Sequence, residues 1–403
     1  MKILMINKFL YPRGGSESYM IKLGDELSKM GHTVEYFGMY DEKNTKENSL
    51  SLYTTNMDFH SKGIERFLYP FKIIYSREAY TKLGKVLDSF KPDVVHMNNI
   101  NFQLTPSIIY AVKKRGIPLV QTVHDYQMIC PNHLLYSFTE ARPCDKCIKG
   151  SKQNCFKYRC IHDSKIKSLI GVIEAKFYSA LKTYKKVDLY ICPSMFLENK
   201  LLGASDIYKG KTYTIHNFIE KKQAVNKTAE KPYIVFVGRL SKEKGVKLLS
   251  DTAKLLPEYS FVVAGNGPDD ECLKGISNVE LKGFVSGQAL TDLMANAKLL
   301  IAPSVCYENC PLSILESHSL GVPVVTMNSG GMAELVEDKK TGVLAKAPTP
   351  EALCEAIKEC LCDEELYKAL KSNCEAKSKN IMGVTEYCEL LTKKYSELME
   401  KGE

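Results

Sequence analysis

Two carboxylates eight positions apart, Glu308 and Glu316, stand in the segment SVCYENCPLSILES at residues 304–317. Pro311 between them is typical of the first position of a helix, so backbone N–H groups such as that of Leu312 should point out of the helix end and favour an anion. Glu308 precedes this helix and Glu316 lies inside it, so they need not flank one bond at the roughly 5 to 9.5 Å of a hydrolase pair. We expect them to contact different parts of one ligand.

A second group of residues is suited to phosphate. In VFVGRLSKEKG a strand is predicted to end at Gly238, followed by Arg239 and, five residues later, Lys244. Two fixed cations at a strand end suit a diphosphate, although alone such a pair is more often solvated. Gly265 in VVAGNGP could let a flat ring approach the backbone, but a tight turn is the commoner explanation. A sugar joined to a nucleoside diphosphate fits the whole set. Its leaving group is already acidic and is stabilised by the cations, so no general acid is required, and the carboxylates accept hydrogen bonds from sugar hydroxyls.

The elements around these residues predict a doubly wound α/β fold. The chain opens with a short apolar run, KILMIN, then Gly14 and Gly15, then a helical pattern that ends at Gly31. Ser16 and Ser194 are candidate helix N-caps. Strands alternating with helices imply a mostly parallel sheet. The further predicted strands of the first half are TVEYFGM, PDVVHMN, PLVQTVHD, VDLYICPS and KTYTIHNF.

The same pattern restarts at YIVFVGRLSKEKG and continues through YSFVVAGNGP, NVELKGFV, AKLLIAPS and GVPVVTMNSGG. Two doubly wound domains joined near residue 225 are therefore predicted. Ligands in open parallel sheets lie beyond the carboxyl ends of the strands, so two facing sheets predict a cleft between domains. The predicted domains are 1–222, with a cysteine-rich insertion near 130–162, then 231–376, and a helix at 377–403 that crosses back to the first domain.

The composition is that of a globular chain. It has 403 residues, of which 44% are hydrophobic and 25% charged. No apolar run approaches the roughly 18 residues of a spanning helix, and the first residues lack the pattern of a signal peptide, so a cytoplasmic protein is expected. Residues 1–222 hold 34 Lys and Arg against 21 Asp and Glu. This basic half suits an anionic partner such as a phosphorylated substrate, a membrane surface or nucleic acid.

Taken together, the motifs identify a family resemblance. The chain resembles the retaining glycosyltransferases of family 4, with the two-domain GT-B fold of two Rossmann-like domains facing a cleft, over nearly all of its length. The matching motifs are Gly14 and Gly15, HDY at His124, PS at Ser194, HNF at Asn217, GRLSKEKG, GNGP and the Glu-x7-Glu spacing. One departure is ENCP, where many relatives have glycine or serine after the first Glu.

The resemblance implies roles for particular residues. Arg239 and Lys244 would bind the donor diphosphate, Glu316 the ribose, Glu308 the sugar hydroxyls and His124 the reacting sugar. The catalytic residues implied are His124, Glu308, Arg239 and Lys244. The donor-binding residues implied are Gly14, Gly15, Gly238, Gly265, Val285, Asn309, Cys310, Leu312 and Glu316. In isolation, a histidine at a strand end such as His124 or His216 is more often packed than catalytic.

The insertion carries a different kind of chemistry. Cys144 and Cys147 form a C-x2-C pair, and Cys155 with Cys160 supplies a second, looser pair that would complete a tetrahedral structural zinc site. The alternative is an inserted loop whose thiols pack together, and the sequence leaves both open. Cys130 and His162 could substitute as ligands. No cofactor is expected to be required for catalysis.

The function implied is transfer of a sugar, with retention, from a nucleotide-sugar donor to an acceptor. A UDP-sugar is favoured and GDP-mannose is the other donor considered. The acceptor expected is a saccharide, lipid-linked, in surface polysaccharide synthesis. The alternatives are a nucleotide-sugar epimerase or a phosphorylase on the same fold, and a nonenzymatic, metal-stabilised module that binds nucleotide or nucleic acid. Nucleic acid is the less favoured partner.

A membrane surface is a further expected partner. In the segment HSKGIERFLYPFKIIYSREAYTKLGKVL, apolar residues alternate with cations around Pro70, which is expected to divide it into two short helices at the boundary of an anionic bilayer. The alternative is that the apolar residues are core and the cations a solvated face. The residues concerned are Phe67, Tyr69, Phe71, Ile73 and Ile74 with Arg66, Lys72, Arg77, Lys82 and Lys85.

Overall fold

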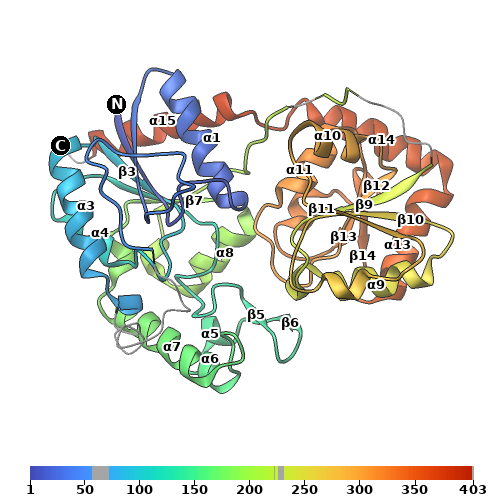
Figure 1. The fold of residues 1–403 in the computed structure, drawn as a ribbon, viewed down its shortest axis with the longest axis horizontal. Helices are drawn as coiled ribbons and strands as arrows, with labels where there is room; N and C mark the ends of the chain where they lie inside the picture. The colour runs from blue at the N-terminus through green and yellow to red at the C-terminus, as the bar shows by residue number, and fades with distance from the viewer. Residues whose placement is uncertain (57–71, 222, 226–230, 402–403) are drawn as a thin grey trace. The chain divides into compact units, whose positions relative to one another are not determined.

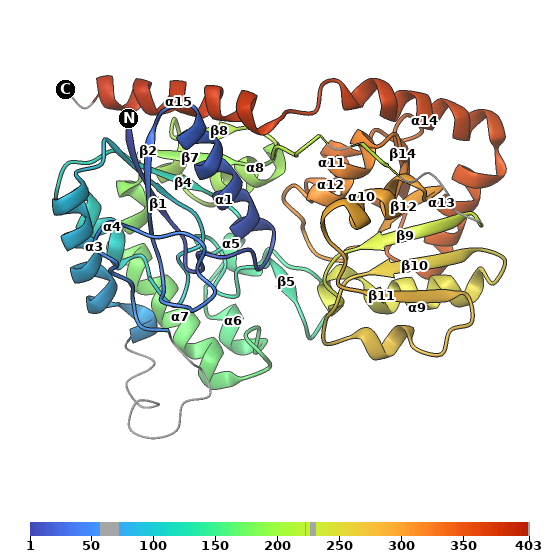
Figure 2. The ribbon, with the colours of Figure 1, turned by 45° about the horizontal axis from the view of Figure 1, so that its top comes forward.

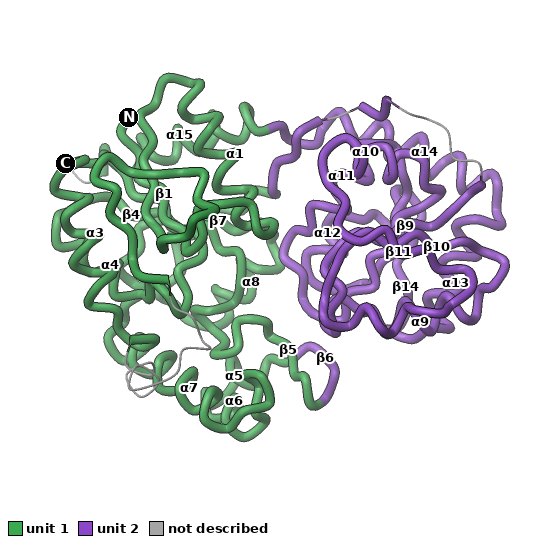
Figure 3. The backbone as a smooth tube through the Cα atoms, in the orientation of Figure 1, with its two compact units in different colours: residues 1–139, 144–216, 384–403 green, residues 140–143, 217–383 purple. Residues whose placement is uncertain are grey.

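The computed structural model describes residues 1–56, 72–221, 223–225 and 231–401. The chain forms two compact units, shown in different colours in Figure 3. Unit 1 comprises residues 1–139, 144–216 and 384–403, and unit 2 comprises residues 140–143 and 217–383. The main break therefore lies between residues 216 and 217, whereas the sequence placed the end of the first domain at residue 222.

Unit 1 is built on a parallel six-stranded sheet with the order β2-β1-β3-β4-β7-β8. Every residue of β3, β4 and β7 is buried, as expected for central strands covered by helices on both faces. The strands are β1 (Lys2–Ile6), β2 (Thr33–Phe37), β3 (Val94–Met97), β4 (Leu119–Thr122), β7 (Leu189–Cys192) and β8 (Thr212–Thr214), and a short hairpin is formed by β5 (Tyr136–Ser137) and β6 (Arg142–Pro143). The predicted α/β class and strand positions are confirmed.

The helices of unit 1 begin where the sequence supplies capping groups. Ser194 accepts a hydrogen bond from the Leu197 N–H at the start of α8, which is the predicted cap. Ser16 is not a cap: α1 begins after Gly14, and Ser16 Oγ instead accepts from Asn99 Nδ2 at 2.8 Å. The helices, drawn in Figure 1, are α1 (Gly15–Lys29), α3 (Arg77–Phe90), α4 (Ser107–Lys113), α5 (Lys146–Lys149), α6 (Asn154–Lys157), α7 (Lys165–Ala180), α8 (Met195–Ala204) and α15 (Val384–Glu400).

The last helix, α15, belongs to unit 1 although it follows unit 2 in the chain. Figure 2 shows it running beside α1. The Tyr387 hydroxyl lies 2.7 Å from that of Tyr19, and the Tyr395 hydroxyl lies 2.5 Å from His96 Nδ1. All four side chains are buried. A polar helix is thus held to the sheet by buried hydrogen bonds that reach β3.

Unit 2 repeats the architecture with a parallel sheet of order β11-β10-β9-β12-β13-β14. Five of its strands were predicted, and the sixth, β14, was not. The strands are β9 (Tyr233–Val237), β10 (Ser260–Ala264), β11 (Val279–Gly283), β12 (Leu299–Ala302), β13 (Val324–Met327) and β14 (Gly342–Ala345). The helices are α9 (Val246–Leu255), α10 (Gly287–Ala295), α11 (Leu312–Ser319), α12 (Met332–Leu335), α13 (Pro350–Cys362) and α14 (Glu364–Ser378).

Each sheet has one point at which the strand order reverses direction. In unit 1 this point lies between β1 and β3, and in unit 2 it lies between β9 and β12. The loops that leave these neighbouring strands run in opposite directions, and the carboxyl ends of strands at such a point are where ligands of doubly wound sheets bind. The two strand pairs are therefore where functional side chains should be sought.

Part of the predicted membrane segment is outside the described residues, namely Arg66, Phe67, Tyr69, Pro70 and Phe71. The described part contains α3, whose apolar residues face the interior, Leu83 and Leu87 among them. For α3 the structure supports the alternative of core residues with a solvated polar face. No helix within the described residues is long and apolar enough to cross a membrane.

Candidate functional site

Lys244 and Glu308 meet at the reversal point of the unit 2 sheet. Lys244 ends the short 3-10 helix Lys242–Lys244 after β9, and Glu308 lies in the loop after β12. The two loops are joined by a backbone hydrogen bond from Val305 N to Glu243 O at 3.0 Å. Lys244 Nζ then donates to Glu308 Oε1 at 2.5 Å. Two residues that the sequence analysis assigned to one ligand are thus in direct contact.

The ion pair is partly shielded from water, and each partner stabilises the charge of the other. Side-chain exposure is 32% for Lys244 and 14% for Glu308. Desolvation opposes the ionisation of Glu308, but the attraction of Lys244 and hydrogen bonds from Lys244 and Ser304 outweigh it and lower the pKa of the carboxyl. Desolvation likewise opposes the charge of Lys244, yet Glu308 outweighs it and raises the pKa of the ammonium. Both groups are therefore charged near neutral pH.

Ser304 and Gly331 support Glu308, and the sequence analysis assigned a role to neither. Ser304 Oγ donates to Glu308 Oε1 at 2.8 Å. Gly331 N donates to Glu308 O at 2.7 Å, and a Cβ at position 331 would lie 1.6 Å from Asn309 O. Only glycine allows this approach of two backbones. The Gly-Gly pair of NSGG was a visible signal, but its partner could not be read from the sequence.

The helix after Glu308 begins as predicted, within one residue. Pro311 is the N-cap of α11 rather than its first residue, and no side chain caps this end. The first backbone N–H groups of α11, starting at Leu312, have no carbonyl partner within the helix and form an end suited to an anion. Glu316 lies in the second turn and is partly buried. Asn217 Nδ2 donates to Cys310 O at 3.1 Å, which ties the HNF motif to this loop.

The remaining donor-binding candidates follow other strands of the same sheet. Gly238 and the exposed Arg239 follow β9, Gly265 follows β10 and Val285 follows β11. Gly265 N donates to Gly283 O at 2.7 Å, and a Cβ at position 265 would lie 1.8 Å from Gly238 O. The glycine is required because three loops come together there. In unit 2, the predicted residues therefore follow the carboxyl ends of four neighbouring strands; they are Gly238, Arg239, Lys244, Gly265, Val285, Glu308, Asn309, Cys310, Leu312 and Glu316.

In unit 1, His124 follows β4 within a buried polar network. Its Nε2 lies 2.9 Å from Asn98 Oδ1, and the ring of Tyr19 contacts it edge-on with centroids 5.0 Å apart. Burial lowers the pKa of His124 to about 3, so the imidazole is neutral near pH 7. A neutral imidazole held by Asn98 can hydrogen-bond a ligand but carries no charge. Gly14 and Gly15 at the start of α1 are the two predicted donor-binding residues in unit 1.

A further polar group in unit 1 was not singled out from the sequence. Lys8 Nζ donates to Asn101 Oδ1 at 2.7 Å, and Asn101 Nδ2 donates to Asp125 Oδ2 at 2.7 Å. These residues follow β1, β3 and β4, so they meet at the reversal point of this sheet. Burial lowers the pKa of Lys8, although Asp125 opposes the shift. Asp125 lies within the HDY motif, which was the available signal.

Three cysteines of the insertion lie close together. Cys147 and Cys155 are buried with Val172, and Cys160 contacts this cluster. The Cys155 thiol hydrogen-bonds that of Cys160, which with burial raises the pKa of Cys155 far above its ordinary range. In the part of the chain that the structure describes, no group of three or more His, Cys, Asp or Glu is placed to hold a metal ion. Zinc at Cys144, Cys147, Cys155 and Cys160 stays a prediction.

Comparison with known proteins is consistent with this arrangement. A model of Glycosyltransferase Family 4 matches residues 13–223, and a model of Glycosyl transferases group 1 matches residues 217–377. The chain belongs to glycosyltransferase family 4. This family 4 glycosyltransferase has the GT-B fold, and its matches cover both units and do not favour an epimerase or a nonenzymatic binding module.

Three similar proteins illustrate the range of the match. An uncharacterized 42.6 kDa protein in the cps region of Klebsiella pneumoniae is 24% identical over 353 residues, covering 83% of this chain and 87% of its own. Sucrose-phosphate synthase from Thermosynechococcus elongatus superposes with a TM-score of 0.71 at 17% identity, over 99% of both chains. Anabaena HepE in complex with UDP and glucose gives 0.68 at 18% identity, over 98% of this chain and 100% of that one.

Proposed function

We propose that this glycosyltransferase transfers a hexose from a UDP-sugar, with retention of anomeric configuration, to a saccharide acceptor linked to a lipid. The Lys244–Glu308 pair carries the proposal, because a cation and a carboxylate are in contact at the reversal point of one sheet, where ligands of doubly wound sheets bind. HepE, whose structure has a similar fold, holds UDP and glucose, which favours UDP over GDP. The cps-region relative supports an acceptor in surface polysaccharide synthesis.

Lys244 would change partner when the donor binds. Without donor its charge is satisfied by Glu308 at 2.5 Å. A diphosphate carries more negative charge than one carboxylate, so Lys244 and Arg239 would turn to the phosphates while the N-terminal end of α11 faces the same anion. Glu308 would then be released to accept hydrogen bonds from the sugar hydroxyls, and Glu316 from the ribose.

In the proposed reaction the bond from the anomeric carbon to the phosphate oxygen breaks, and a bond to the acceptor oxygen forms on the same face. The acceptor proton passes to the departing phosphate oxygen, which leaves as UDP. Lys244 and Arg239 would stabilise the negative charge that grows on that oxygen. His124, held neutral by burial, would orient the reacting sugar through a hydrogen bond. No cofactor enters this scheme.

A panel of UDP- and GDP-sugars tests the donor and the reaction together. Slow release of nucleoside diphosphate from one UDP-sugar in the absence of acceptor is expected, and proton NMR of the released or transferred sugar should show the donor's anomeric configuration. Glu308→Gln is the matched negative control, because it removes one charge and little volume. Turnover of a GDP-sugar alone, or an inverted product, would contradict the proposal.

A further inference from the structure

Helix α7 presents large apolar side chains to solvent along one face. Positions 166, 169, 173 and 177 follow steps of three and four residues, which align them on one side of a helix. The exposed fractions are 73% for Ile166, 44% for Leu169, 45% for Ile173, 38% for Phe177 and 47% for Leu181 just beyond the helix. Five of the fourteen exposed large apolar residues in the described chain therefore lie within sixteen positions. Exposed apolar surface gathered in this way is typical of an interaction site.

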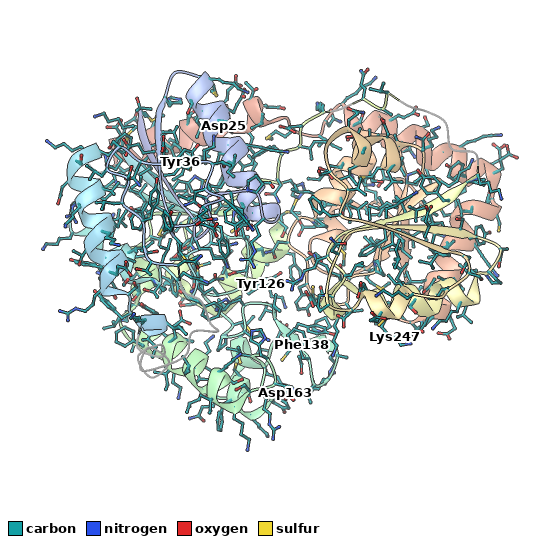
Figure 4. The ribbon with its side chains drawn as sticks, in the orientation of Figure 1. Asp25, Tyr36, Tyr126, Phe138, Asp163 and Lys247 are labelled. Atoms are coloured by element: carbon teal, nitrogen blue, oxygen red, sulfur yellow. The ribbon has the colours of Figure 1, made fainter. Side chains whose placement is uncertain are left out.

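The opposite face of α7 is fixed to unit 1. Val172 packs in the cluster formed by Cys147 and Cys155, and Ser168 Oγ accepts a hydrogen bond from Ile161 N at 3.1 Å. Near the end of the helix the Tyr178 hydroxyl donates to the carbonyl of Ile74. Figure 1 shows α7 beside α6 at the periphery of the unit, and Figure 4 marks Asp163 just before its start. These contacts fix the orientation of α7, so its apolar face points outward.

The charge around this face is mainly positive, with the exposed Asp163 directly before the helix as an acidic exception. The exposed lysines from residue 164 to residue 187 are Lys165, Lys167, Lys176, Lys182, Lys185 and Lys186. Within that range Glu174 is the one acidic residue, and it is 3% exposed. Burial raises its pKa to about 7, so it is only partly ionised near neutral pH. The surface consists of an apolar stripe bordered by cations.

We propose that this α7 face, defined by Ile166, Leu169, Ile173, Phe177 and Leu181 with the six surrounding lysines, binds the surface of an anionic lipid bilayer. Apolar side chains would enter the boundary below the head groups while the lysines contact the anionic head groups. A second copy of the chain is a poor occupant, because a symmetric contact would bring two sets of six lysines together. The inference deepens the proposed function, since it adds the surface that would hold a lipid-linked acceptor.

Sedimentation with vesicles tests the proposal on the full chain. Phosphatidylcholine vesicles with and without phosphatidylglycerol are compared at low and high salt. Ile166→Ser with Ile173→Ser should reduce the partition coefficient on anionic vesicles by about tenfold or more, and Lys165→Gln with Lys176→Gln by a similar factor. Leu255→Ser is the matched control, because Leu255 is 51% exposed on α9 of unit 2 and should leave binding unchanged.

The outcomes separate this inference from the proposed function. Anionic-vesicle binding that weakens with salt and is lost in both α7 variants, with donor hydrolysis intact, supports the α7 face. Equal binding by the Ile166→Ser/Ile173→Ser variant and the unaltered chain overturns it, as does equal binding to neutral vesicles. A concentration-dependent dimer that the same variant abolishes, without vesicle binding, would also overturn it. Absence of donor hydrolysis by the unaltered chain would refute the transferase scheme and leave the membrane-binding inference standing.

Discussion

Replacing Glu308 by glutamine should separate the two roles proposed for this carboxylate, which are to pair with Lys244 in the absence of donor and to bind the sugar hydroxyls when the donor is present. The amide keeps the shape and one acceptor oxygen but removes the negative charge 2.5 Å from Lys244 Nζ. We expect turnover to fall by about two to three orders of magnitude, which is the usual cost of losing a charged contact to the transition state. Affinity for UDP should not fall with it, because Lys244 no longer has to leave a carboxylate in order to bind phosphate.

The size of the gain in affinity follows from the exposure of the pair. A charge-assisted hydrogen bond contributes about 1.5 to 3 kcal/mol when well buried. With Lys244 32% exposed, solvent screening reduces this to about 1 kcal/mol, or roughly fivefold tighter UDP. The free energy of unfolding should fall by a similar amount.

Calorimetric titration with UDP and steady-state kinetics measure these two effects separately. Glu271→Gln is the matched control: Glu271 pairs with Lys274 at the same 2.5 Å, but its side chain is 78% exposed. That variant should change neither turnover nor UDP affinity. If UDP affinity in Glu308→Gln falls in proportion to turnover, Glu308 supports the loop rather than the sugar and the partner exchange of Lys244 is refuted.

Four further predictions concern the other residues of the candidate site and the buried contacts of α15. Glu316→Gln should mainly raise the KM for the donor with little change in kcat, and Arg239→Ala should weaken UDP binding by about tenfold or more; calorimetry that finds UDP affinity unaltered would contradict the second. Burial lowers the pKa of His96 to about 3, so below about pH 6.5 the unfolded chain binds a proton at this residue that the folded chain does not. His96 should therefore contribute about 1.4 kcal/mol per pH unit to the fall in the free energy of unfolding between about pH 6 and 3, and His96→Gln should remove that contribution from the slope in urea titrations. Tyr395→Phe leaves buried His96 Nδ1 without its partner and should cost about 1 to 3 kcal/mol of stability, whereas an unchanged urea midpoint would refute the role of that hydrogen bond.

Much of the fold could be predicted because its signals are local. Apolar runs that end in glycine, such as the one before Gly238, predicted the strands, and a proline predicted the start of α11 to within one residue. The strand β14 was missed because GVLA is a run of four residues with no clear period. Its pairing with β13 is what makes it a strand.

The candidate site was predictable in its members but not in its contacts. Lys244 and Glu308 are 64 positions apart, and their ion pair depends on β9 and β12 being neighbours in the sheet, which no local pattern states. The support of Glu308 by Gly331 depends on the same long-range packing. For α7 the sequence shows apolar residues on several sides, and only the packed cysteine cluster decides which of them remain exposed.

The return of α15 to unit 1 has a consequence for how the protein is made. Synthesis proceeds from the N-terminus, so residues 217–383 have all left the ribosome before Tyr387 and Tyr395 are available to Tyr19 and His96. Unit 2 can complete its sheet during synthesis, whereas unit 1, although made first, must wait for the last helix. Until then the surface of α1 that α15 covers is open to solvent.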